Sequence, residues 1–283
     1  ACAYNMPEVA LKLIETGNSN PEYINAANST ALIYACENSM LEVALKLLET
    51  GKSIPGHINE YNNTALYWAF NTYNMTEVTL KLLKNSESNL NYTIIDYNTA
   101  LIYACQHRMS AVALKIIELA NYKLDQIDNG NTALIIACQN IMSDVALKLI
   151  ETGKANPEHI NNDGNTALIY ACKNYYMTKV ALKLIETGKS NLEHINNDGD
   201  TALIQACLNS MPDVALKLIE TGKSNSEQVN KYGKTALVIA YNTNCMSEVV
   251  VKLLEINESS NNNNINEVAG EGKCQIHYLI EMF

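Results

Sequence analysis

One short phrase recurs along the chain at a nearly constant interval. The tripeptide Thr-Ala-Leu occurs at intervals of 33 to 35 residues, beginning at Thr30, Thr64, Thr99, Thr132, Thr166, Thr201 and Thr235. A second phrase, EVALKLIETG and its variants, follows each copy and also precedes the first one. Such periodicity is typical of repeat proteins, in which a unit buries its apolar face only against its neighbours. The sequence therefore predicts a stacked array rather than an ordinary globular domain.

The copies divide residues 1–283 into a single predicted array. A partial unit covers residues 1–25, and a degraded unit covers 267–283. The whole units between them span about 26–59, 60–94, 95–127, 128–161, 162–196, 197–230 and 231–266. The chain begins ACAYNMPEVA, without Met and inside a repeat, which indicates a trimmed chain.

Each unit is expected to form two helices. In TALIYACKN the hydroxyl of Thr166 is placed to cap the first helix, and Leu168, Ala171 and Cys172 follow at helical spacing. In MSDVALKLIETG (142–153) we expect Ser143 to cap the second helix and Gly153 to end it in a left-handed conformation. The Asn-rich stretch between units predicts a turn or short hairpin.

These phrases resemble the ankyrin repeat family. The stretches DGNTALIYAC (163–172) and VALKLIETG (180–188) are similar to the family patterns D-x-x-G-x-T-P-L-H-x-A-A and V-x-x-L-L-x-x-G. The resemblance implies an all-α solenoid of stacked helix-turn-helix units with short loop or hairpin connectors. The wording of the repeats also resembles arrays of large DNA viruses.

Two family positions differ in this chain. The family Pro is Ala in every unit, and the family His is Ile in most units. The Thr–His hydrogen bond of the family is therefore absent, and we expect the isoleucine to replace it by packing.

Charge and hydropathy exclude several classes of partner. The net charge is −10, with 20 Lys and Arg residues of which Arg108 is the single arginine. Nucleic acids and anionic membrane surfaces require clustered basic residues, so neither is expected to bind. The sequence contains no run of 18 apolar residues, so no transmembrane helix is predicted.

The cysteines and histidines occupy repeated positions, which favours structural roles. Five of the eight cysteines share one position of the first helix, too far apart between units for disulfides and without a C-x-x-C pair for zinc. They predict buried thiols in a reducing compartment, the cytoplasm, or a host cytoplasm for a viral protein. His57, His159 and His194 share a connector position with Gln, Tyr and Thr. That interchange favours a structural role over metal binding.

No pattern indicates an enzyme. The chain has no G-x-S-x-G, phosphate-binding loop or H-E-x-x-H motif. We therefore expect no catalytic residue, no cofactor-binding residue and no metal site. Lys and Glu repeat three residues apart in the second helix, at Lys183 and Glu186 for example, and predict a solvated, charge-paired outer face.

Positions that differ between copies are those that the scaffold is not expected to dictate. They fall at the connector tip, two and three residues before each Thr, and on the first helix. The ankyrin resemblance implies that these positions line the concave groove where partners bind. The candidate partner-binding residues are Tyr34, Tyr61, Trp68, Tyr97, Tyr103, Tyr170 and Tyr232. The helix aromatics have a second interpretation, packing between neighbouring helices, and both remain open.

The sequence thus predicts a non-enzymatic scaffold, a monomeric array that binds a partner protein along its groove. The alternative is a substrate-recruiting adaptor, for example of a ubiquitin ligase, whose effector segment lies outside this chain.

Overall fold

The structure is a computed structural model that describes residues 1–72, 74–86, 97–120 and 123–265. Its contacts divide the chain into two compact units, which are described separately. Unit 1 comprises Ala1–Asp128 and Asp144–Ala155, and unit 2 comprises Asn129–Ser143 and Asn156–Phe283.

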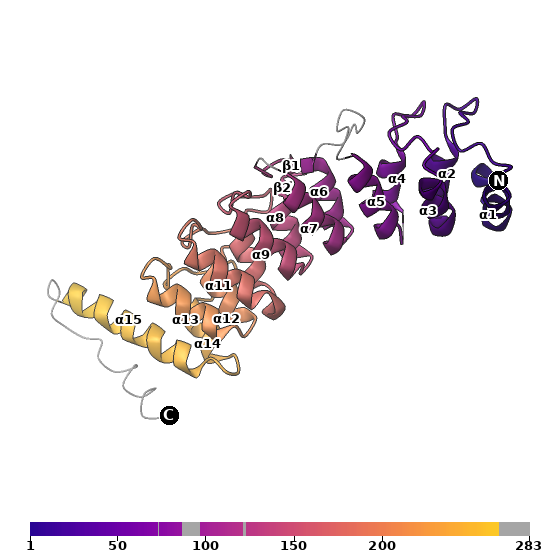
Figure 1. The fold of residues 1–283 in the computed structure, drawn as a ribbon. Helices are drawn as coiled ribbons and strands as arrows, with labels where there is room; N and C mark the ends of the chain where they lie inside the picture. Colours follow the sequence, from indigo (N-terminus) through magenta and orange to yellow (C-terminus); the bar gives the residue numbers. More distant parts are fainter. Residues whose placement is uncertain (73, 87–96, 121–122, 266–283) are drawn as a thin grey trace. The chain divides into compact units, whose positions relative to one another are not determined.

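Unit 1 is a stack of helix pairs (Figure 1). Its elements are η1 (Cys2–Tyr4), α1 (Pro7–Glu15), α2 (Ala31–Glu37), α3 (Leu41–Glu49), α4 (Ala65–Asn71), α5 (Thr76–Ser86), α6 (Tyr97–Gln106), α7 (Ser110–Leu119), β1 (Ile127–Asp128) and most of α9 (Ser143–Thr152). The first helices α2, α4 and α6 contact one another in series, and so do the second helices α1, α3, α5 and α7.

Unit 2 repeats this arrangement. Its elements are β2 (Asn131–Thr132), α8 (Ala133–Gln139), α10 (Ala167–Cys172), η3 (Tyr175–Met177), α11 (Thr178–Glu186), α12 (Ala202–Leu208), α13 (Pro212–Glu220), α14 (Ala236–Tyr241) and α15 (Ser247–Ile265). Helices α8, α10, α12 and α14 contact in series, as do α11, α13 and α15. Among the described residues the strands comprise four residues in all, β1 and β2. The predicted all-α solenoid of helix pairs is therefore confirmed in each unit.

The first helices begin as the sequence predicts. In six repeats the hydroxyl of the capping threonine accepts a hydrogen bond from the backbone N–H three residues later, at Thr30, Thr64, Thr132, Thr166, Thr201 and Thr235. Such a cap satisfies one of the unpaired N–H groups at a helix start. The donating residue is a fully buried isoleucine in four of them, Ile33, Ile135, Ile169 and Ile204. The expectation that isoleucine replaces the family histidine by packing is confirmed.

The predicted cap of the second helix is wrong. Helix α9 begins at Ser143 itself, and the Ser143 hydroxyl donates to the carbonyl of Tyr176 at 3.3 Å. In α3, α7, α11 and α13 the cap position is a buried methionine with no side-chain capping bond. Burial of an apolar side chain is the stronger requirement here and displaces a polar cap. At the other end, the prediction for Gly153 is confirmed, since its φ is 64°.

The outer face of the second helices carries the expected charge pairs. Lys46 lies 3.2 Å from Glu49, and Lys81 of the next repeat lies 3.3 Å from the same carboxylate. Hydrogen bonds from these two lysines, Lys46 first, lower the pKa of Glu49. Equivalent pairs join Lys183 to Glu186, Lys217 to Glu220 and Lys252 to Glu255. In these repeats the lysines and glutamates of the outer face therefore pair with one another.

The repeated cysteine position belongs to the core, as predicted. Cys36, Cys105, Cys138, Cys172 and Cys207 are buried thiols within the first helices. Burial raises the pKa of Cys105 and Cys207 to about 12. Cys245 is exposed, and Cys274 lies outside the described residues.

Within the part of the chain that the structure describes, no helix is both long and apolar enough to span a membrane.

Candidate functional site

Five of the seven connectors carry an asparagine five residues before the threonine, and it is buried at Asn59, Asn161, Asn196 and Asn230. The side-chain oxygen of Asn196 accepts from the backbone N–H groups of Asp198 (3.0 Å) and Asp200 (2.9 Å). The backbone N–H of Asn196 donates to the Asp200 carbonyl at 3.0 Å. The same three bonds form at Asn25, Asn59, Asn161 and Asn230. A single side chain thus closes the loop that presents the tip residues.

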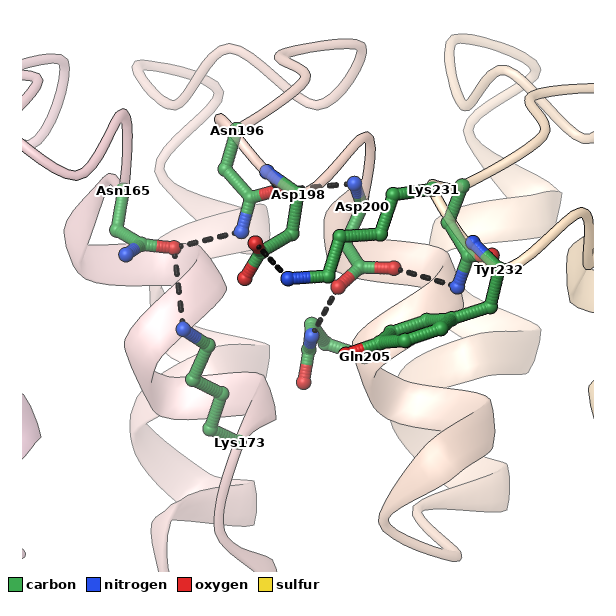
Figure 2. Close-up of polar contacts among 9 residues, drawn as sticks. Asn165, Lys173, Asn196, Asp198, Asp200, Gln205, Lys231 and Tyr232 are labelled. Carbon is green, nitrogen blue, oxygen red and sulfur yellow. Dashed lines mark hydrogen bonds and ion pairs between the residues drawn. The ribbon is translucent and has the colours of Figure 1, made fainter.

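The same asparagines tie successive repeats together. In unit 2 the side-chain amide of Asn161 donates to Asn131 (2.9 Å), that of Asn196 to Asn165 (2.8 Å), and that of Asn230 to Asp200 (2.9 Å). Figure 2 shows the Asn196–Asn165 bond and the Gln205 amide that donates to Asp200 at 2.8 Å. Buried polar networks with every partner present hold their members in one geometry. The tips are therefore fixed platforms rather than loose loops.

The connector histidines belong to this framework. Nε2 of His57, His159 and His194 lies 2.8, 2.9 and 2.7 Å from a backbone carbonyl in the preceding tip. A carbonyl only accepts, so Nε2 carries the hydrogen and donates. The amide of Gln228 makes the equivalent bond to Gly199 at 3.2 Å. The prediction of a structural histidine is confirmed at these three positions.

Of the two variable positions at each tip, backbone conformation restricts one. The residue two before each capping threonine has a positive φ, from 50° at Asn28 to 82° at Gly130. Only Gly and Asn tolerate this region readily, so the scaffold dictates that residue after all. At Gly164 an added Cβ would lie 2.6 Å from the Asn197 side chain of the next tip. The residue three before the threonine carries the variation.

Two of the seven candidate residues occupy this variable tip position and are exposed. Tyr61 is 72% exposed and Tyr232 is 70% exposed. Tyr97 was predicted at a tip but is the first residue of α6 and is half-buried. The connector before Thr99 has Ile94 at the position where five other connectors have an asparagine that closes the tip.

The candidate aromatics on the first helices are all half-buried and several make internal contacts. The hydroxyl of Tyr34 accepts from Asn25 at 3.1 Å, and that of Tyr170 accepts from Asn161 at 3.3 Å. The Tyr103 ring lies 6.1 Å from the core residue Phe70. Packing is therefore part of their role, and their remaining surface is still presented beside the tips.

Trp68 differs from the other helix aromatics in one respect. Its ring packs edge-on against Tyr67, with centroids 5.4 Å apart. Its indole N–H is buried, and no described residue accepts a hydrogen bond from it. A buried donor without a partner is rare in folded proteins, because leaving it unpaired is costly.

Lysines cover the aromatic side chains of the tip surface in unit 2. Lys231 forms an ion pair with Asp198 of the preceding tip at 2.5 Å and lies 5.1 Å above the Tyr232 ring (Figure 2). Lys173 lies 4.9 Å above the Tyr170 ring. The Lys231–Asp198 hydrogen bond raises the pKa of Lys231 and lowers that of Asp198.

The tip surface of unit 1 carries carboxylates instead. Glu60 precedes Tyr61, and Glu37 ends α2. The charge of Glu60 raises the pKa of Tyr61, with smaller contributions from Tyr34 and Glu37. Glu60 and Lys231 were not singled out from the sequence. The sequence did distinguish them, because the two residues occupy the same repeat position and carry opposite charges.

Among the described residues, no group of three or more His, Cys, Asp or Glu side chains could hold a metal ion.

The family model for ankyrin repeats, a model of three copies, matches residues 1–94, 101–193 and 142–228. No curated protein matches the chain.

Proposed function

Because this chain belongs to the ankyrin repeat family, whose repeats are generally protein–protein interaction modules, we propose that it is a non-enzymatic scaffold that binds a partner protein through its connector tips and first helices. We further propose that it acts as a single monomeric array in the cytoplasm. The buried thiols of the first helices favour such a reducing compartment.

One observation carries this proposal: large aromatic side chains stand exposed on rigid loops. Tyr61 and Tyr232 occupy tips that the buried asparagines Asn59 and Asn230 hold in place. A tyrosine offers a large contact area with few rotatable bonds, and a rigid platform lowers the entropy lost on binding. The outer face of the second helices offers fewer unpaired groups to a partner, since its lysines and glutamates pair with each other.

The test is a differential capture of proteins from cell extract. The wild-type chain, a Tyr61→Ala/Tyr232→Ala variant and a Lys183→Ala variant serve as parallel baits. We expect a partner that the wild type and Lys183→Ala retain and that the double tyrosine variant loses. Capture that depends on Lys183 but not on the tyrosines would place binding on the opposite face and contradict the proposal. A ubiquitin-ligase subunit retained by all three baits would favour the adaptor alternative.

A further inference from the structure

The two units carry the same tyrosines with opposite charges beside them. On the first helix, four residues after the capping threonine, unit 1 has Tyr34 and unit 2 has Tyr170. Three residues later unit 1 has Glu37, whereas unit 2 has Lys173. The lysine lies 4.9 Å above its tyrosine ring, which is cation–π distance.

The connector tips show the same reversal. Three residues before the threonine stand Tyr61 in unit 1 and Tyr232 in unit 2, and the residue before each is Glu60 or Lys231. In unit 2 Lys231 lies 5.1 Å above the tyrosine ring and bonds to a tip carboxylate. Unit 2 therefore contains two lysines that each lie over a tyrosine ring of this surface, and one of them also pairs with a tip carboxylate.

In unit 1 the tyrosines and glutamates at these positions belong to adjacent connectors and helices. The connector that carries Glu60 and Tyr61 rests on the preceding connector, since Asn28 donates to the Ile58 carbonyl at 3.0 Å and His57 to the Asn28 carbonyl at 2.8 Å. The influence of Tyr34 and Glu37 on Tyr61 agrees with this proximity.

No lysine or arginine in the described ranges neutralises that surface. Among the described residues, neither Glu37 nor Glu60 forms an ion pair with a lysine or arginine. Tyr61 is 72% exposed and Glu60 is exposed beside it. Trp68, at the position of Tyr34 in the adjacent helix α4, adds a buried N–H that lacks an acceptor.

We propose that Tyr34, Glu37, Glu60, Tyr61 and Trp68, the acidic aromatic face of unit 1, bind a partner segment through an arginine side chain. The guanidinium stacks on a tyrosine ring, as Lys173 and Lys231 lie over rings in unit 2, and it pairs with the two carboxylates, as Lys231 pairs with Asp198. This inference rests on the proposed function and specifies the chemistry of the partner.

Trp68 is the single tryptophan of the chain, so its fluorescence reports on this face directly. The probe is acetyl-Gly-Arg-Gly-Gly-Arg-Gly-amide, titrated into the full chain, with the Glu analogue of the same peptide as a control. We expect a saturable change in Trp68 emission with the Arg peptide alone. No saturable change, or equal binding of the Glu peptide, overturns the proposal.

Charge reversal supplies the matched variants. Glu37→Lys/Glu60→Lys recreates the lysines of unit 2, which should fill the face from within and weaken Arg-peptide binding at least about tenfold. Glu22→Lys/Glu42→Lys changes the net charge equally at exposed residues of unit 1 outside the face and should change binding less than about twofold. Melting curves establish that both variants are folded. Equal weakening in both pairs means that only net charge matters and overturns the proposal.

The two proposals fail separately. A partner captured through Tyr61 whose affinity is unaffected by Glu37→Lys/Glu60→Lys leaves the proposed function standing and rejects the arginine site. Loss of tip-dependent capture, with the Arg peptide still bound, rejects the scaffold and leaves the arginine site.

Discussion

A buried asparagine at the start of four tips, Asn59, Asn161, Asn196 or Asn230, converts a polar loop into a fixed one. Asn196 closes its own turn and reaches the preceding repeat, and it is only 5% exposed. Its neighbour Asn197 is exposed and makes a side-chain bond of 3.2 Å to the Asn162 carbonyl. Of these two adjacent asparagines, Asn196 is therefore structural and Asn197 belongs to the surface.

We predict that Asn196→Ala lowers the free energy of unfolding by about 1–3 kcal/mol, because the tip N–H groups lose their buried acceptor. Asn197→Ala should cost less than about 0.5 kcal/mol, as surface changes usually do. Urea denaturation of both variants measures the difference. Equal losses of stability in the two variants would contradict the role of Asn196 in holding the tip.

The thiols give a second prediction at this scale. Burial raises the pKa of Cys207 to about 12, whereas a cysteine in an unfolded chain ionises near about 8.5. Only the thiolate is alkylated, so at pH 8.5 native Cys207 should resist iodoacetamide while exposed Cys245 reacts. Peptide mass spectrometry follows each site. Equal rates for the two cysteines in the native chain would contradict the assignment of Cys207 to the core.

Ionisation of these thiols also sets the direction of a pH effect on stability. Above about pH 8.5 the unfolded chain releases thiol protons that the folded chain retains. The contribution of the buried thiols to stability is therefore complete below that pH and declines as the pH rises towards about 12, the pKa of folded Cys207.

Among the elements, helix α7 ends without the left-handed glycine that closes most second helices. Its sequence has Ala120 where α1, α3, α9, α11 and α13 are followed by a glycine with positive φ, and Ala120 has a φ of −66°. The ammonium of Lys154 instead donates to the carbonyls of Ile117 (2.5 Å) and Ala120 (2.6 Å). A cation there also opposes the negative end of the helix dipole. One repeat thus supplies the cap that its neighbour lacks.

We predict that Lys154→Met destabilises unit 1 by about 1–3 kcal/mol, because two carbonyls lose a charged donor. Lys189→Met is the matched control, since Lys189 follows the same Thr-Gly pair but is exposed. Hydrogen exchange of the last amides of α7 provides the local measurement. Faster exchange in both variants, or in neither, would contradict the capping role.

The helices were predictable because their signals are local. The capping threonine of the first helix, the apolar stripes and the terminal glycine of the second helix lie close together in the sequence and recur in register. Ser143 misled because the choice of cap depends on the burial of the methionine before it, which is a tertiary property. The Lys154 cap could not be predicted either, because its partners are 34 and 37 residues away along the chain.

At the scale of the whole molecule, repetition builds the stacked fold, and we propose that departures from it mark the binding surface. The exposed tyrosines of the tips could be selected from sequence as variable residues. The left-handed backbone beside them and the lysines stacked on Tyr170 and Tyr232 could not, since both depend on how connectors rest on one another. The acidic aromatic face of unit 1 is recognisable only by comparison with the lysine–tyrosine contacts of unit 2.

The most direct test is the affinity of the captured partner for Tyr61→Ala and for Lys183→Ala, measured by calorimetry with melting temperatures of both variants. Tyr61 is largely exposed, so its truncation should leave the fold intact. We predict a loss of about 2 kcal/mol, roughly thirty-fold in Kd, for Tyr61→Ala. Lys183→Ala should lose well under about 1 kcal/mol, since it removes only an exposed ion pair. A larger loss for Lys183→Ala, with both proteins folded, would contradict binding at the tips.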